Sequence, residues 1–163
     1  MRGGVWHRKQ RENRLQHAEF DAQDFLKEHK RTTNTDLFFL LGLYLGEGAK
    51  GEGKVLFANA NPRVIQAFLL LLRKVFPLDE KRLKIQLLLR YDQDKQKTQL
   101  FWSTITKIPI SQFQKVQSDL RTKNIPTFAS YKGVCAICYS DAKIQRFLLA
   151  LQRQHLDSIL SQV

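Results

Sequence analysis

The stretch from Asp36 to Lys50 constrains the fold of this chain more than any other. It reads DLFFLLGLYLGEGAK, so ten consecutive apolar or glycine residues precede a single carboxylate and another glycine. A helix that is apolar on every side is expected to be buried on every side. We therefore predict a helix at the centre of the fold, with Thr35 or Asp36 as its N-cap.

Two glycines of this helix, Gly42 and Gly46, lie four residues apart and share one face. Each costs about 1 kcal/mol of helix stability relative to alanine, and close approach of another backbone is the simplest compensation. Glu47 follows at the C-terminal end, where the helix dipole disfavours a carboxylate unless a cation is bound there. The plain alternative is a buried helix that ends in a solvated Glu47 and a capping Gly48.

The nine residues from Leu40 to Gly48 resemble the LAGLIDADG motif of homing endonucleases. Gly42 falls on the first glycine of the motif, Gly46 on its second small residue and Glu47 on its last acid. The resemblance to the single-motif bacterial members of the family extends over roughly residues 36 to 151. It rests on four further stretches: Val55 to Pro62, Phe101 to Ser103, Ile108 to Phe113, and Gly133 to Asp141.

This resemblance implies a homodimer in which two motif helices pack across a two-fold axis through Gly42 and Gly46. It also implies that Glu47 binds a divalent metal, Mg²⁺, that cleaves DNA. Leu45 stands where the archetypal motif has an earlier acid, so Glu47 alone is expected as a ligand. The family further suggests a basic residue on the sheet near each scissile phosphate, for which Lys84 and Arg90 are the candidates.

The implied function is a site-specific double-stranded DNA endonuclease that acts as a homodimer by metal-dependent phosphodiester hydrolysis. The alternative is a catalytically inactive, domesticated relative that binds specific DNA sequences as a regulator. A structural RNA-binding protein would explain the basic composition but not the pattern of Gly42, Gly46 and Glu47. The sequence has no G-x-x-x-x-G-K-[ST] motif, so an NTPase is not supported. No small-molecule cofactor is expected.

The net charge of +12 and the pI near 10.0 indicate a polyanionic partner, nucleic acid first and an anionic membrane second. From residue 82 to 132, ten Lys or Arg residues stand against three carboxylates, which makes this the most basic block. The longest apolar run is about half of what a membrane-spanning helix needs. We therefore expect a cytoplasmic protein without a membrane partner.

The periodicity predicts an α+β domain over residues 36 to 163, with a small mixed or antiparallel sheet of three to four strands backed by helices. The segment 81–91 alternates, with Lys84, Gln86 and Arg90 on its polar face. Such a face suits DNA, because cations reach phosphates and Gln or Arg read base edges. Lys50 and Lys54 complete the predicted DNA contacts.

The remaining elements follow from the same patterns. We predict strands at 54–59 and 134–140, helices at 62–76 and 94–106, a short helix at 112–120, and a closing helix after Asp141 whose end frays from His155. Cys135 and Cys138 form one C-x-x-C, which without a second ligand pair is better read as two reduced thiols than as a zinc site.

Residues 1 to 35 are predicted to form a basic helical arm and linker of one or two helices. An apolar seam recurs at helical spacing, in Leu15, Ala18, Ala22, Phe25 and Leu26. The basic opening, which either lies on DNA phosphates or is a solvated helix face, consists of Arg2, Arg8, Lys9, Arg11 and Arg14 against Glu12.

Overall fold

The computed structural model describes residues 3–51 and 53–162, and side chains from residue 6 onward. The chain divides into two compact units, Met1–Thr35 and Asp36–Val163, which are considered separately. Arg2, part of the predicted basic opening, lies outside the described residues.

The first unit, whose last residues begin the next helix, consists mainly of the helix α1 (Gly3–Glu28). Every described side chain of this helix is exposed, including Leu15 and Phe25 of the predicted apolar seam. Phe25 stacks on the His29 ring, with centroids 3.9 Å apart, and the other described residues of the seam remain exposed to solvent. On the surface of this helix, the Lys27 ammonium group forms an ion pair with the Asp24 carboxylate, 2.8 Å away.

The motif stretch forms α2 (Thr33–Glu47), which starts earlier than predicted. The Thr32 hydroxyl accepts from the Thr35 amide (3.2 Å), and the Thr32 amide donates to the Thr35 hydroxyl (2.8 Å), so these two threonines cap the helix reciprocally. The predicted caps were thus placed too late. Asp36 lies inside the helix, buried, with its carboxylate 2.6 Å from the ammonium group of Lys74.

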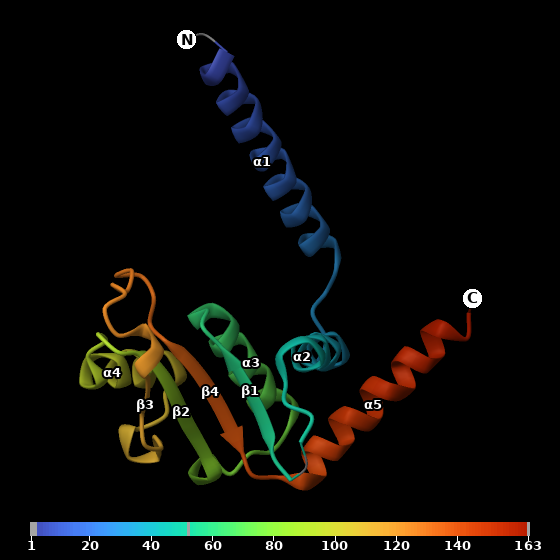
Figure 1. The fold of residues 1–163 in the computed structure, drawn as a ribbon. Helices are drawn as coiled ribbons and strands as arrows, with labels where there is room; N and C mark the ends of the chain where they lie inside the picture. The colour runs from blue at the N-terminus through green and yellow to red at the C-terminus, as the bar shows by residue number, and fades with distance from the viewer. Residues whose placement is uncertain (1–2, 52, 163) are drawn as a thin grey trace. The chain divides into compact units, whose positions relative to one another are not determined.

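Four strands form one mixed sheet in the order β1-β4-β2-β3 (Figure 1). They are β1 (Val55–Asn59), β2 (Leu83–Arg90), β3 (Gln117–Asp119) and β4 (Val134–Tyr139). β4 lies between β1 and β2 and is antiparallel to both, whereas β3 runs parallel to β2 at the edge. The predicted α+β class with a small mixed sheet is confirmed.

Alternation along the strands gives the sheet one buried face and one open face. In β2, the buried face carries Leu83, Ile85, Leu87 and Leu89. These side chains join the strand residues Val55, Phe57, Cys135 and Ile137 in one core with apolar residues of the helices. Phe57 stacks on Phe68 of the helix layer with ring centroids 3.9 Å apart.

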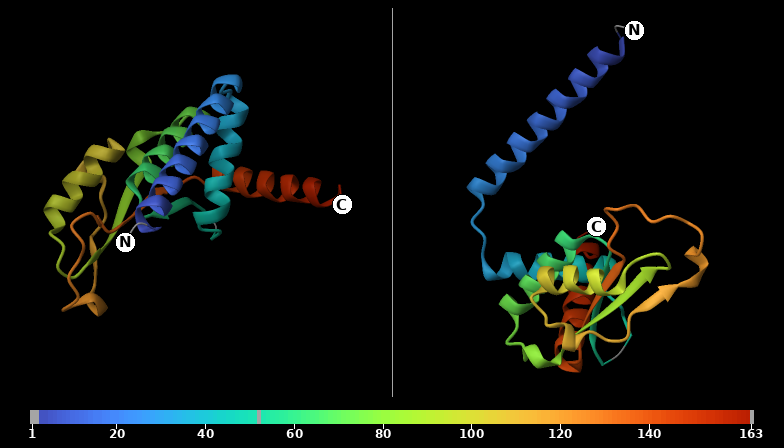
Figure 2. Two further views of the ribbon diagram at one scale, coloured as in Figure 1. Left: turned by 90° about the horizontal axis from the view of Figure 1, so that it is seen from above. Right: turned by 90° about the vertical axis from the view of Figure 1, so that its left-hand side faces the viewer.

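The buried face is covered by α3 (Pro62–Val75) and α4 (Lys95–Thr106), which lie together on one side of the sheet (Figure 2). The N-terminus of α3 follows the predicted pattern, because the Asn61 side chain accepts from the Arg63 amide and Pro62 occupies the first turn. Asp94 caps α4 in the same way, through the Lys97 amide. The helix layer leaves the opposite face of the sheet open.

The short helix predicted at 112–120 is wrong. The structure has a 3₁₀ helix (Ile110–Gln112), the extended strand β3, and a second 3₁₀ helix (Leu120–Thr122). Pairing with β2 draws this segment out, since the Gln114 amide donates to the Ile85 carbonyl and Phe113 forms a bridge with Ile85. A third 3₁₀ helix (Glu80–Arg82) leads into β2.

The last helix, α5 (Ala142–Leu160), continues past the point where fraying was predicted. Two buried glutamines tie α5 to the rest of the second unit. Gln145 donates to the Gly51 carbonyl (2.5 Å) and accepts from the Gly53 amide, and Gln152 donates to the Leu41 carbonyl (2.9 Å). None of the described helices has the length and apolarity needed to cross a membrane.

Gly48 provides a test of how α2 joins the sheet. A Cβ atom at this position would overlap the ring and the carbonyl oxygen of Tyr44. We expect Gly48→Ala to lower the free energy of unfolding by about 1–3 kcal/mol, as overpacked sites do. Gly51→Ala is the matched control, because a Cβ atom there meets open space. Urea unfolding measures both changes, and equal stabilities would contradict the assigned close contact.

Candidate nucleic-acid interface

The open face of the sheet is defined here as the side chains of β2, β4 and β1 that point away from the helix layer. On β2 it carries Lys84, Gln86, Leu88 and Arg90, as the alternation predicted. Cross-strand pairing places Lys84 opposite Cys138 and Gln86 opposite Ala136. The neighbours of these two polar side chains on β4 are therefore small, which leaves that side of them open.

Lys54 belongs to the same face. It immediately precedes β1, and its charge acts on the thiol of Cys138, which pairs with Leu56 of β1 and Lys84 of β2. Burial raises the pKa of Cys138, and the nearby Lys54 ammonium opposes part of that rise. The structure thus brings two predicted DNA-binding lysines to one side of one sheet.

The two thiols point to opposite faces, because they are three residues apart on one strand. Cys135 is fully buried in the core, and burial strongly raises its pKa, whereas Cys138 belongs to the open face. Both are free. This geometry agrees with the interpretation of two reduced thiols, since the pair cannot chelate one metal ion from opposite faces.

Gln86 and Arg90 have partners within the chain. The Gln86 amide donates to the side-chain oxygen of Gln114. The Arg90 guanidinium reaches the Ile125 carbonyl at 3.5 Å, while its Nε is buried without an acceptor among the described residues. Arg90 therefore joins the end of β2 to the loop that follows β3, and Lys84 is the less encumbered cation on the strand.

Lys50, predicted as a phosphate contact, has partners within the chain. Its ammonium group donates to the Tyr44 carbonyl (2.5 Å) and the Leu45 carbonyl (3.3 Å), at the C-terminal end of α2. It also lies 4.7 Å from the centre of the Tyr44 ring, and partial burial lowers the pKa of Lys50. Two of its three donors are therefore used to satisfy helix carbonyls.

Gly42 and Gly46 are exposed on the outer side of α2, and a Cβ atom at either would meet nothing within 4 Å. Within one chain, the helix is therefore buried on one side only, and the expected close contact at the two glycines is not made by any other part of the second unit. Leu40 and Tyr44 are fully buried, but the opposite side carries Phe38, Phe39 and Leu45 at 46%, 59% and 44% exposure. We call this exposed set, with its two glycines, the glycine face.

A groove runs between the glycine face and α5. It is lined mainly by apolar side chains, namely those of Phe38, Leu41, Leu45 and Leu156, with Gly42, Gln152 and His155. The Phe38 and His155 rings lie 4.9 Å apart across it. The second half of α5, which the sequence pattern did not mark as ordered, thus extends the apolar surface of α2.

Glu47 is the last residue of α2 and is exposed. The chain then turns directly onto the sheet, because Gly48 bridges Phe57 and the Ala49 amide donates to the Leu56 carbonyl at 2.8 Å. This places the carboxylate beside β1, the edge strand next to α2. Among residues 3–51 and 53–162, no three His, Cys, Asp or Glu side chains are grouped to hold a metal ion.

Several residues that hold this region were not found by sequence reasoning. Gln145 fixes the segment after the motif through its two hydrogen bonds and also bonds to Tyr44, whose pKa burial raises. The sequence did not single out the glutamines of α5, because the hydrophobic periodicity of a helix identifies them only as polar residues and not as buried ones. Asp36 was expected as a cap, and its buried ion pair with Lys74 depends on a helix far along the chain.

Comparisons of the chain with protein-family models, curated proteins and solved structures found no match.

Proposed function

We propose that this chain is a LAGLIDADG-type endonuclease that cleaves double-stranded DNA as a homodimer, with Mg²⁺ at Glu47. The observation that carries the proposal is the glycine face of α2: an exposed apolar surface with two glycines that ends in a single carboxylate. Isolated exposed apolar residues are ordinary, whereas a contiguous set marks an interaction surface. A second copy of the same helix fits this surface, because Gly42 and Gly46 leave room for a backbone.

Dimerisation through this face would bring two Glu47 carboxylates together from the two chains. Magnesium is held in many phosphoryl-transfer sites by one or two carboxylates, with waters and substrate phosphates completing its shell. The exposed carboxylate of Glu47 fits such a site, and the bound ion would polarise the phosphodiester and activate a water. Each chain supplies one ligand, so the proposed active site is complete only in the dimer.

The open face of the sheet is the proposed DNA-binding surface. Lys54 and Lys84 would contact phosphates, and Gln86 is placed to read a base edge in the major groove. Lys84 is the better candidate for a role near the scissile phosphate, because Arg90 is engaged with the Ile125 carbonyl. In this proposal Lys50 supports the carbonyls of α2 and acts on the DNA only through its charge.

A second candidate function follows from the lone carboxylate of Glu47, because no three His, Cys, Asp or Glu side chains of the described residues are grouped to hold a metal ion. A domesticated regulator would use the same dimer and the same open face to bind specific DNA without cutting it. The two functions share every surface and differ only at the metal.

The open face is tested by Lys84→Ala. Each phosphate neutralised on duplex DNA contributes a slope of about −0.9 in log K against log salt, so we expect weaker binding and a slope reduced by about one. Arg63→Ala removes the same charge from exposed α3 in the helix layer and serves as the control. Fluorescence anisotropy over a salt series measures both. Identical salt slopes for Lys84→Ala and the wild type would exclude this lysine from the interface.

The dimer is tested by Gly46→Leu. Within one chain the new side chain has open space, so the variant should still fold, which far-UV circular dichroism would check. Its melting temperature should fall only by the stabilisation that the dimer contributes. In a dimer the side chain would block close approach of the two helices, and sedimentation should show a monomer. Gln66→Leu adds an exposed leucine to α3 and should leave the dimer intact. A wild-type protein that sediments as a monomer, with and without DNA, would remove the composite site.

The metal site is tested by Glu47→Gln in a cleavage assay over a random target library, with Mg²⁺ or with EDTA. The amide is nearly isosteric but lacks the charge that attracts Mg²⁺. Cleavage should be lost, while DNA affinity stays equal or improves because a carboxylate beside phosphates repels them. Cleavage by Glu47→Gln at the wild-type rate would defeat the metal assignment. Absence of cleavage in both proteins, with DNA binding retained, would favour the regulator.

A further inference from the structure

The loop between β3 and β4 carries the most exposed apolar side chain that the structure describes. Phe128 is 78% exposed, and Leu120 and Ile125 near it are 71% and 52% exposed. The right-hand panel of Figure 2 shows this orange loop projecting beyond the strands, on the side away from α3. The segment between β3 and β4 thus presents three large apolar side chains to the outside of the second unit.

The loop is held firmly on both sides of Phe128. The Asp92 carboxylate accepts from the amide (2.8 Å) and the hydroxyl of Thr127. Beyond the phenyl group, the Gln93 side chain donates to the Tyr131 carbonyl (2.9 Å), and the Trp102 indole donates to the Lys132 carbonyl (2.7 Å). A side chain presented by a braced loop loses little conformational freedom when it binds, which favours a specific contact.

The loop also borders the open face. Arg90, the last residue of β2, reaches the Ile125 carbonyl, so the backbone of the loop lies against a side chain of that face. β3, from which the loop departs, pairs with the same end of β2, with Asp119 opposite Arg90. A duplex lying on the open face would meet the loop at its β3 edge.

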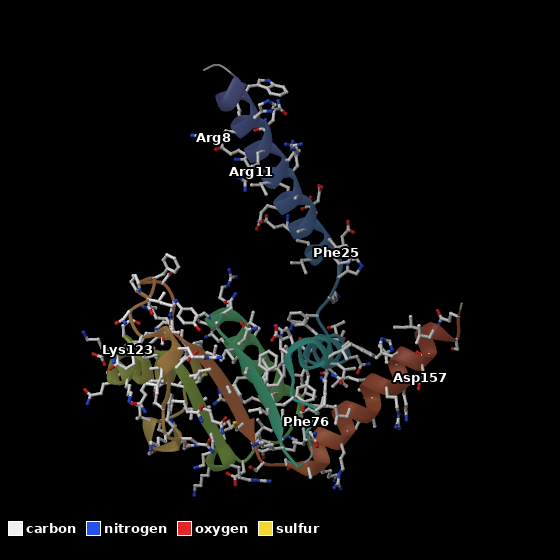
Figure 3. All side chains as sticks on the ribbon, viewed as in Figure 1. Arg8, Arg11, Phe25, Phe76, Lys123 and Asp157 are labelled. Atoms are coloured by element: carbon white, nitrogen blue, oxygen red, sulfur yellow. The ribbon has the colours of Figure 1, made fainter. Side chains whose placement is uncertain are left out.

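The surroundings favour a polyanion as the partner. The loop belongs to the block from residue 82 to 132, in which ten Lys or Arg residues face three carboxylates. Lys123, labelled in Figure 3, precedes Phe128 on this loop and has its ammonium group 5.7 Å from the centre of the Tyr91 ring. In the sequence, Arg121 comes before Lys123 and Lys132 follows Phe128. The three carboxylates of the block are each engaged: Asp119 by Arg121, Asp92 by Thr127, and Asp94, which lines a hollow with Phe128, by the amide and ammonium groups of Lys97.

From these observations we propose that Phe128 is a wedge that inserts between base pairs of the duplex bound on the open face. Proteins that bend DNA insert apolar side chains of this kind between base steps, with basic residues holding the adjacent phosphates. The proposal rests on the proposed DNA binding, but it does not require cleavage or Mg²⁺. It makes the loop a second contact, separate from the phosphate contacts of the strands.

The test uses the full chain and a pool of random-sequence duplexes in which adenines are replaced by 2-aminopurine. Base stacking on an aromatic side chain is worth about 1–3 kcal/mol per base by alanine substitution, so Phe128→Ala should weaken binding about fivefold or more. The fluorescence of 2-aminopurine should rise when the wild type unstacks a step and stay low with Phe128→Ala. Phe128→Leu keeps an apolar wedge and should retain part of both effects.

Leu70→Ala is the matched control, because Leu70 is 57% exposed on α3 in the helix layer. It should bind and perturb the duplex as the wild type does. Phe128→Ala should melt at the wild-type temperature, since the side chain is largely solvent-exposed already. Equal affinities of Phe128→Ala and Leu70→Ala, or an unchanged 2-aminopurine signal with the wild type bound, would overturn the wedge while leaving DNA binding in place.

Two further outcomes also decide the matter. If the wild type binds no duplex even at low salt, the wedge and the proposed function fail together. If Phe128 instead drives binding to anionic phospholipid vesicles and not to duplex DNA, the loop is a membrane contact and the wedge is excluded.

Discussion

The close contact between Gly48 and Tyr44 determines where α2 meets the sheet. The Gly48 amide donates to the Tyr44 carbonyl at 2.9 Å, and the space that a side chain would take is filled by the Tyr44 ring. The Tyr44 hydroxyl in turn donates to the Ala49 carbonyl at 2.7 Å. Within two residues of its end the helix is therefore joined to β1, and this fixes the position of Glu47 beside the sheet edge.

Sequence patterns were informative wherever local chemistry determines an element. Asn61 and Pro62 set the start of α3, and the alternation of β2 correctly placed Lys84 and Gln86 on one face. Both features depend on neighbouring residues only, through a side-chain cap or the period of an extended chain. The fold class and most of the helix and strand positions follow from such signals.

The errors occurred where distant contacts overrule local preference. The segment at 112–120 is extended because it pairs with β2, a partner some thirty residues earlier. Within one chain, the outer side of α2 is exposed because the second unit covers only the side that carries Asp36, Leu40, Leu41 and Tyr44. Gln145 and Gln152 can be buried because their side-chain amides donate to backbone carbonyls of other segments. No local sequence pattern indicates these hydrogen bonds.

The strand order links the proposed surfaces into one geometry. β1 lies next to Glu47, whereas β3 and its loop lie at the other edge, three strand spacings of about 4.8 Å away. A two-fold axis along the glycine face would therefore place both Glu47 carboxylates at the centre and both Phe128 wedges at the outer ends. The wedges would then be separated by at least about 30 Å, close to the 34–36 Å of one turn of B-DNA. With this spacing, the two wedges would contact the duplex from the same side and could bend it toward or away from the central carboxylates. Bending and cleavage would then act on one stretch of DNA.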